Sequence, residues 1–420
     1  MTAKTKRLQT WLGLIAVAIC LVPVAIMGLY VYMSAMATPL HPSPQDVTSV
    51  TESDPLRQWD GAVRRSQDIV RAILADQNLP GVSVAVGTGG QIVWAEGFGW
   101  ADLERRDPVT PSVRFRIGTA SAALTSAAVG LLLEEDRFKL DDVIQTSVPE
   151  FPKKEWPITV GQLMGHLAGV RNDGGDEGPL YSAHCEAPVD ALRHFADSAL
   201  RFQPGTQYRY SSYGWILVSA AVEATAGEPF FTFMQEEVFE PLGMNDTRAD
   251  DAKVDFASED PVPVPVPGQA TAYFPKFAAD PRYGPDLMRP VNYSCYAGAS
   301  AFLSTPSDLV RFAMAINSGK LLQPATVQSL QTTQRLSSGD ETGYGLGWDL
   351  ETVELVGKPT RWVGHNGTIL GGMVASFMTF PDYGLVIAVT SNTSYADTET
   401  LAVKIAQAFA EEAQSFDAPR

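Results

Sequence analysis

The chain is poor in cysteine and histidine, and this scarcity excludes several classes of protein. Its 420 residues include three cysteines, Cys20, Cys185 and Cys295, and no C-x-x-C pair. They cannot build a disulfide framework; Cys20 lies in an apolar run, so at most one bridge, Cys185 to Cys295, remains open. The five histidines show no H-E-x-x-H or comparable spacing. We therefore expect no metal and no other cofactor.

Positive charge is also scarce. The chain has 31 Lys and Arg against 48 Asp and Glu, a formal net charge of -17, and no basic cluster beyond the extreme N-terminus. Such a chain has no general affinity for phosphate backbones, so nucleic acid is not an expected partner. Hydrophobic residues at 45% and charged residues at 19% suffice for a sizeable core, which excludes a disordered chain.

The N-terminus carries one long apolar run. Trp11 to Met33 is uncharged and follows Lys4, Lys6 and Arg7. About 20 apolar residues span a bilayer, and flanking positive charge keeps that end in the cytoplasm. We therefore predict a membrane anchor within residues 1–37, with the remaining chain outside the cytoplasm, in the periplasm if the source is bacterial.

A cleaved signal peptide is the alternative for this segment, because Ala35-Met36-Ala37 matches the A-x-A cleavage pattern. It would give a secreted protein. Residues 38–55 are polar and contain several prolines, which predicts a tether. The folded part is expected over residues 56–415.

The order of strand and helix patterns indicates one mixed domain. Strand-like runs lie near residues 82–100, with a Gly-rich turn at 87–90, and again over 360–391. Helical spacing dominates from about 119 to 245, including a helix expected over 187–199, and residues 261–267 alternate proline with valine. This predicts an α/β fold of the α+β type: an antiparallel sheet built from both chain ends and flanked by helices, beside an all-helical lobe.

Several short motifs, in this order, resemble the serine β-lactamase-like family of class C β-lactamases, DD-peptidases and related esterases. The matching stretches are Leu79–Ser83, Phe115–Gly118, Leu140–Asp142, Thr159–Leu163, Pro204–Thr206, Glu240–Met244, Leu303–Thr305 and Gly343–Trp348. Val148–Pro152 and a Tyr-Ser-Ser variant are most similar to its mitochondrial serine β-lactamase-like branch. The resemblance implies a β-lactamase/DD-peptidase-like fold and serine-hydrolase chemistry.

The family's first catalytic element is S-x-x-K at a helix start, where a hydroxyl nucleophile is deprotonated by a lysine one turn later. The corresponding residues are Thr119-Ala120-Ser121-Ala122. Thr119 thus occupies the nucleophile position and Ala122 the lysine position. Shifting the register to Ser121 restores nothing, because Leu124 would then replace the base. A helix N-cap is the structural alternative for Thr119.

The second element, Tyr-x-Asn, corresponds to Tyr210-Ser211-Ser212. The resemblance implies that Tyr210 relays protons to the leaving group and that Ser212 binds substrate. An aromatic core position ahead of the following helix is the alternative for Tyr210.

The third element, Lys/His-x-Gly on a strand, corresponds to His365-Asn366-Gly367-Thr368. The resemblance places His365 near a substrate carboxylate or leaving group, and Asn366, Gly367 and Thr368 along the substrate. A structural histidine is the alternative for His365. His166 is interpreted as a buried, hydrogen-bonded residue at a helix end.

These motifs leave three functions open. One is a membrane-tethered family member with little or no acyl transfer, which keeps its cleft for a small-molecule or peptide ligand. Another is a residual esterase, amidase or peptidase that uses Thr119 and Tyr210. A structural assembly protein is the third. The first two require Thr119, Tyr210 and His365 to converge, and an amine near the Thr119 hydroxyl would favour the second.

Overall fold

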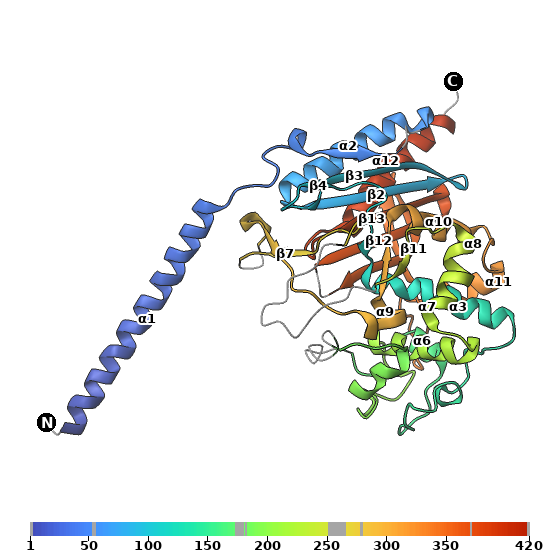
Figure 1. Cartoon of the computed structure of the whole chain (residues 1–420), viewed down its shortest axis with the longest axis horizontal. Coiled ribbons are helices and arrows are strands. Elements are labelled where there is room, and N and C mark those ends of the chain that lie inside the picture. The colour runs from blue at the N-terminus through green and yellow to red at the C-terminus, as the bar shows by residue number, and fades with distance from the viewer. Residues whose placement is uncertain are drawn as a thin grey trace.

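The computed structural model describes residues 3–52, 56–172, 180, 183–250, 266–277, 280–369 and 372–417. The proline–valine alternation of residues 261–267 therefore lies mostly outside the described residues. The largest element is an eight-stranded sheet in which β1, β3, β2, β13, β12, β11 and β10 follow one another and β4 pairs with β3 (Figure 1). Its strands are β1 Ser49–Thr51, β2 Gly81–Thr88, β3 Gln91–Asp102, β4 Asp107–Pro108, β10 Asp349–Leu355, β11 Lys358–Ile369, β12 Met373–Phe380 and β13 Leu385–Ser391.

The two chain ends meet where β2 pairs with β13, with Ala85 opposite Ala388. Every pairing in this sheet is antiparallel. This confirms the predicted antiparallel sheet built from both ends of the chain. Strand β10 was not predicted, because its outward, charged positions interrupt the apolar pattern that marks the inner strands.

Helices cover both faces of the sheet. On one face α2 (Asp60–Asp76) and α12 (Thr398–Asp417) pack together, and on the other α10 (Pro306–Asn317) packs on β2 and β13. Side chains alternate accordingly, since Val84 joins the core under α2 and α12 while Ala85 joins the opposite core. A strand covered on both faces reads as a continuous apolar run, which is how β2 is recognised in the sequence.

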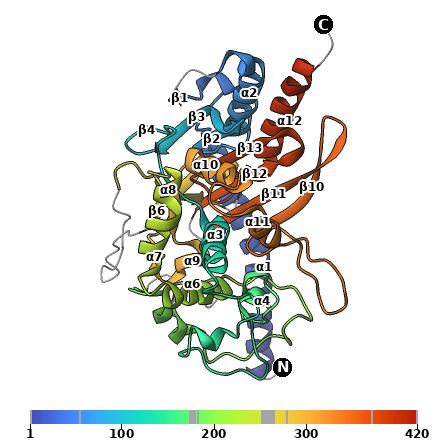
Figure 2. The ribbon, with the colours of Figure 1, turned by 90° about the vertical axis from the view of Figure 1, so that its right-hand side faces the viewer.

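The middle of the chain forms the predicted helical lobe. Figure 2 shows α4 (Val160–Met164) and α6 (Ser212–Ala226) toward the end of the molecule away from α2 and α12, with α3 (Ser121–Glu134) between α6 and the sheet. The helix expected over 187–199 is wrong in type and length, because Pro188–His194 forms 3-10 turns. The remaining elements include α7 Phe230–Phe233, α8 Glu240–Leu242, α9 Ala297–Ser300, α11 Pro324–Leu330, β5 Phe115–Arg116, β6 Arg248–Ala249, β7 Tyr273–Pro275, β8 Pro285–Leu287 and β9 Phe302–Ser304.

The N-terminal apolar run forms a single helix, α1 (Ala3–Met36), which projects from the domain (Figure 1). The residues after it differ from the predicted tether, because they pack on the domain. The Leu40 N–H donates to Asn78 Oδ1 at 2.6 Å, and the buried His41 imidazole lies 3.1 Å from the Leu79 carbonyl oxygen. Strand β1 then pairs with β3 and covers an otherwise open sheet edge.

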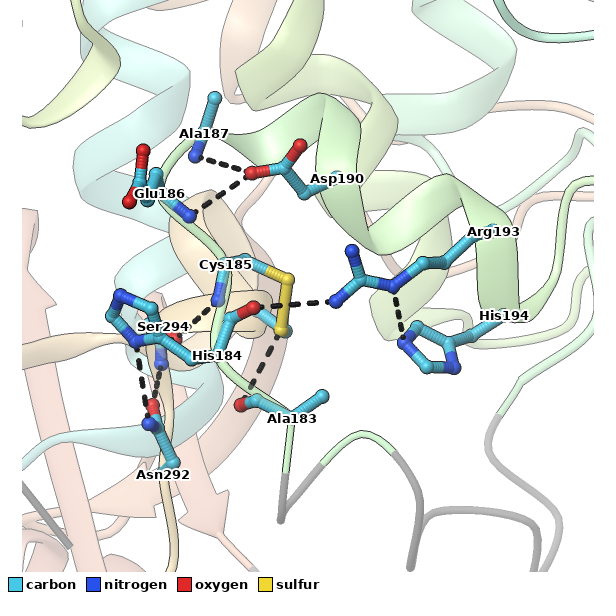
Figure 3. The surroundings of a disulfide bond; sticks show 11 residues. Ala183, His184, Cys185, Glu186, Ala187, Asp190, Arg193, His194, Asn292 and Ser294 are labelled. Atoms are coloured by element: carbon cyan, nitrogen blue, oxygen red, sulfur yellow. Dashed lines mark hydrogen bonds between the residues drawn. A yellow bond between two sulfur atoms is a disulfide. The ribbon is translucent and has the colours of Figure 1, made fainter.

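A disulfide joins Cys185 to Cys295, with Cα atoms 4.9 Å apart, while Cys20 is free. This settles the pairing that the sequence left open. Figure 3 shows the Cys185 N–H donating to Ser294 Oγ at 3.0 Å beside the bridge. The bond ties the segment before the 3-10 turns of 188–194 to the segment that leads into α9.

Removing this bridge should destabilise the domain. It closes a loop of 110 residues, so its loss frees the unfolded chain and is expected to lower the free energy of unfolding by about 2–4 kcal/mol. Chemical denaturation of the Cys185→Ala/Cys295→Ala double variant checks this against a Cys20→Ser control. Equal stability of the two would contradict it.

The packing of residues 38–52 predicts two different truncation outcomes. Deletion of residues 1–37 should leave a soluble, folded domain, because the described segment Ile19–Met36 of the removed helix is not buried. Deletion of residues 1–52 also removes buried Val47 and strand β1, and should cost at least about 2 kcal/mol. Thermal melts of both forms provide the measurement, and aggregation of the shorter deletion would show that α1 belongs to the folded core.

Candidate active site

Thr119 lies where a 3-10 turn, Gly118–Ala120, leads into α3. Its hydroxyl donates to the Asn366 carbonyl at 3.2 Å and accepts the Thr368 N–H at 3.2 Å. Both partners are main-chain groups of β11. The N-cap alternative is wrong, since the residue before α3 is Ala120 and Thr119 makes no capping bond. The hydroxyl instead links the helix start to the strand.

Gly367 permits this link. A Cβ at this position would lie 1.9 Å from the Ile117 carbonyl oxygen and 2.9 Å from the Ala120 nitrogen. Only a residue without a side chain allows β11 to approach the turn so closely. Gly367, which was expected to lie along the substrate, is therefore the residue at which β11 contacts the turn before α3.

The position of the family's lysine provides no base. Ala122 and Ser121 are both fully buried, and the Ser121 hydroxyl has no hydrogen-bond partner within the described ranges. In the same part of the chain, no lysine amine or imidazole makes a hydrogen bond to Thr119. Lys253 lies outside the described residues. The Thr119 hydroxyl therefore bonds to two backbone groups of β11, and no described amine contacts it.

Tyr210 lies beside Thr119. Its hydroxyl is buried beside the hydroxyls of Thr119 and Ser212. Burial raises the pKa of the Tyr210 phenol, and the nearby Thr119 and Ser212 hydroxyls oppose that effect only in part. The phenol therefore stays protonated at neutral pH, which suits a hydrogen-bond donor better than a general base.

His365 lies on β11 but is buried, with its Nε2 2.9 Å from the Tyr344 hydroxyl and its Nδ1 2.7 Å from the Asn366 carbonyl oxygen. Asp349 Oδ2 lies 3.8 Å from Nδ1. Tyr344 thus pairs with Nε2, and the expected place of His365 near a substrate carboxylate or leaving group stays a prediction. Sequence reasoning gave Tyr344 no role, although it stands within the quoted Gly343–Trp348 motif.

His166 joins the same aromatic cluster, with its ring centre 4.2 Å from that of Tyr210 and 4.7 Å from that of Tyr344. It is buried just after α4, and its Nδ1 accepts the Ser211 N–H at 3.1 Å. This confirms the interpretation as a buried, hydrogen-bonded residue at a helix end. Burial, with a smaller effect of His365, lowers the pKa of His166 to about 3, so the ring is neutral.

Two residues expected to bind substrate make other contacts, Ser212 through its backbone and Asn366 through its side chain. Ser212 is buried at the start of α6, where its N–H donates to Asn172 Oδ1 at 3.0 Å. The Asn366 amide donates to Glu399 Oε2 of α12 at 2.8 Å, so it extends toward the α12 face of the sheet. Of the β11 residues, Thr368 is exposed and is placed to meet a ligand. No sequence signal pointed to Asn172.

The structure thus brings Thr119 and Tyr210 together beside β11, with His365 behind them in contact with Tyr344. It supplies hydroxyl groups and backbone N–H groups, and the nearby His166 and Tyr210 side chains are neutral. Within the described ranges, no group of three or more His, Cys, Asp and Glu residues is placed to hold a metal.

The fold is that of penicillin-binding-protein-like hydrolases. FmtA from Staphylococcus aureus superposes with a TM-score of 0.68 at 19% identity, covering 87% of this chain and 91% of that one. A D-amino acid amidase from Ochrobactrum anthropi gives 0.67 at 20% identity, covering 85% and 99%.

The chain belongs to the beta-lactamase family, whose model matches residues 67–410. Curated relatives include the mitochondrial serine beta-lactamase-like protein LACTB of Homo sapiens, 25% identical over 83% of this chain and 80% of that protein. Penicillin-binding protein 4* of Bacillus subtilis is 26% identical over 68% of this chain and 62% of that protein. The resemblance to the serine β-lactamase-like family, including its mitochondrial branch, is confirmed.

The neutral state of His166 predicts a loss of stability in mild acid. Its pKa is lowered from 6.5 in the unfolded chain to about 3, so only the unfolded chain takes up a proton between these values. The contribution of neutral His166 to the free energy of unfolding is fully present above pH 6.5. It decreases as the pH is lowered, by about 2 kcal/mol at pH 5. Denaturation of wild type and His166→Asn across this range checks it.

Asparagine can accept the Ser211 N–H and tolerates the positive φ of 59° at this position. The variant should therefore fold, with a stability that depends less steeply on pH between 6.5 and 4.5. Identical pH slopes for the two proteins would contradict the assignment.

Proposed function

We propose that this protein is a membrane-tethered, extracytoplasmic member of the beta-lactamase family that binds a small-molecule or peptide ligand beside Thr119 without acyl transfer. The observation that carries the proposal is the pairing of the Thr119 hydroxyl with the Asn366 carbonyl and the Thr368 N–H, while the lysine position is Ala122. A nucleophile needs a base, and losing one member of such a unit costs orders of magnitude in rate.

Binding is supported by the groups that surround Thr119. Thr368 is exposed, Thr119 is partly exposed, and the α3 N-terminus lies beside them. Free N–H groups at a helix start attract anions, and family members hold substrate between such a helix and the neighbouring strand. A carboxylate-bearing ligand is therefore the chemistry that this site favours.

A residual hydrolase that uses Thr119 and Tyr210 is the alternative. It is favoured by the proximity of the Tyr210 hydroxyl to Thr119, which lowers the tyrosine's pKa slightly. The hydrolase alternative is opposed by the burial of the Tyr210 phenol, which raises its pKa by more than Thr119 lowers it. A phenol that holds its proton at neutral pH cannot deprotonate a secondary hydroxyl efficiently.

The tether is supported by α1, whose segment Ile19–Met36 is long and apolar enough to cross a membrane and is not buried by the domain. The basic residues before it favour a cytoplasmic N-terminus. A signal sequence can have the same length and apolar composition. The mass of the mature chain therefore decides between a retained anchor and a cleaved signal peptide.

The proposal predicts that the protein neither hydrolyses nitrocefin nor forms a covalent adduct with a fluorescent penicillin. Acylation needs a deprotonated hydroxyl, and among the described residues no amine bonds to Thr119 to take that proton. Gel fluorescence and intact mass after incubation provide the measurement. Stoichiometric labelling of wild type that disappears in Thr119→Ala would establish the residual hydrolase instead.

The matched control restores the family pattern. Thr119→Ser with Ala122→Lys should recover labelling, whereas each single change should do much less, because nucleophile and base act as a unit. Ala122 is fully buried, so the folded state of each lysine variant is checked by its melting curve. Labelling by the Thr119→Ser single variant alone would show that another group serves as base.

A further inference from the structure

We propose that the β7–β8 hairpin, together with the 3-10 turn Pro281–Tyr283, rests in the lipid headgroup region beside the membrane anchor. The hairpin then fixes how the domain sits on the bilayer. This inference rests on the tether proposed above and adds to it a second point of contact with the membrane.

The aromatic residues of α1 define where the helix leaves the hydrocarbon. Trp11 and Tyr30 are exposed and lie 19 residues apart, which corresponds to about 28 Å of helix and thus to the thickness of the hydrocarbon core. Tryptophan and tyrosine concentrate at both membrane interfaces. Tyr30, followed by the exposed Tyr32, therefore marks the outer interface.

The hairpin meets the helix at this level. The Tyr30 and Tyr283 rings make an edge contact with centres 6.2 Å apart, and the hydroxyls of Ser34 and Tyr283 lie 3.2 Å apart. The Arg282 guanidinium lies over both tyrosine rings, at 5.9 and 5.3 Å. Figure 1 shows β7 on the side of the domain that faces the end of α1.

Asn78 links the segment that follows α1 to the β7–β8 hairpin. Its Oδ1 accepts the Leu40 N–H at 2.6 Å, and its Nδ2 donates to the Pro281 carbonyl at 3.0 Å. The chain leaving the anchor and the hairpin are thus fixed to the same side chain. A bilayer that holds α1 necessarily lies close to the hairpin.

The hairpin's own surface suits an interface. Phe274 and Leu287 are 38% and 40% exposed, and Phe277 packs on Tyr283. Within residues 273–289 the charged residues are Lys276, Arg282 and Arg289 against Asp280 and Asp286, three positive and two negative. This net charge of +1 contrasts with -17 for the chain. Exposed apolar groups among basic residues are the pattern that anionic headgroups attract.

An environment-sensitive label tests the contact in the full-length chain. In a Cys20→Ser background, Phe274→Cys is labelled with the fluorophore NBD, and the protein is reconstituted into phosphatidylcholine–phosphatidylglycerol vesicles. The matched control is Phe416→Cys, since Phe416 is 50% exposed near the end of α12, far from α1. We expect a blue shift and quenching by doxyl-labelled lipid at position 274 and neither at 416.

Flotation with the vesicles separates the two proposals. A chain that floats while its label at 274 behaves like that at 416 would overturn the hairpin contact and leave the tether intact. Failure to float would overturn both. Melting curves establish that the labelled variants are folded. A further variant combines Phe274→Asp with a label at Leu287→Cys. If it floats equally well but its label is no longer quenched, the hairpin itself makes the contact.

Discussion

The approach of strand β11 to the turn before α3 is the constraint on which the site depends. Gly367 removes the side chain that would collide with the Ile117 carbonyl, and the Thr119 hydroxyl then pairs with the main chain on either side of it. Sheet and helical lobe are joined at this place. The two hydrogen bonds of Thr119 tie the start of α3 to β11, and under the proposed function their role is to stabilise the fold.

Burial keeps two titratable groups near Thr119 uncharged. The pKa of His166 falls and that of the Tyr210 phenol rises, so both remain neutral near pH 7. The Tyr344 hydroxyl pairs with His365 Nε2. With Ala122 in place of a lysine and both of these groups neutral, neither His166 nor Tyr210 is a ready base for the Thr119 hydroxyl, which favours ligand binding over proton transfer.

Much of the fold could be predicted from the sequence, because buried strands such as β2 and β13 are continuous apolar runs and motif order identified the family. The positions of Thr119 and Ala122 followed from the same motifs. Burial and side-chain partners could not be predicted, because the face to which each strand residue points is set by pairings distant in sequence. The Asn366 side chain bonds to Glu399, and the His365 side chain bonds to Tyr344. The packed segment 38–52 was missed because prolines and polar residues resemble a linker.

The stability of a Thr119→Val variant tests the central claim most directly. Valine keeps the shape of threonine but leaves the Thr368 N–H and the Asn366 carbonyl without their partner. The account predicts a loss of about 1–3 kcal/mol in the free energy of unfolding, while Thr119→Ser, which keeps the hydroxyl, loses much less. A Thr119→Val variant as stable as wild type, or more stable, would contradict it, because active-site residues kept for catalysis are commonly held at a cost to stability.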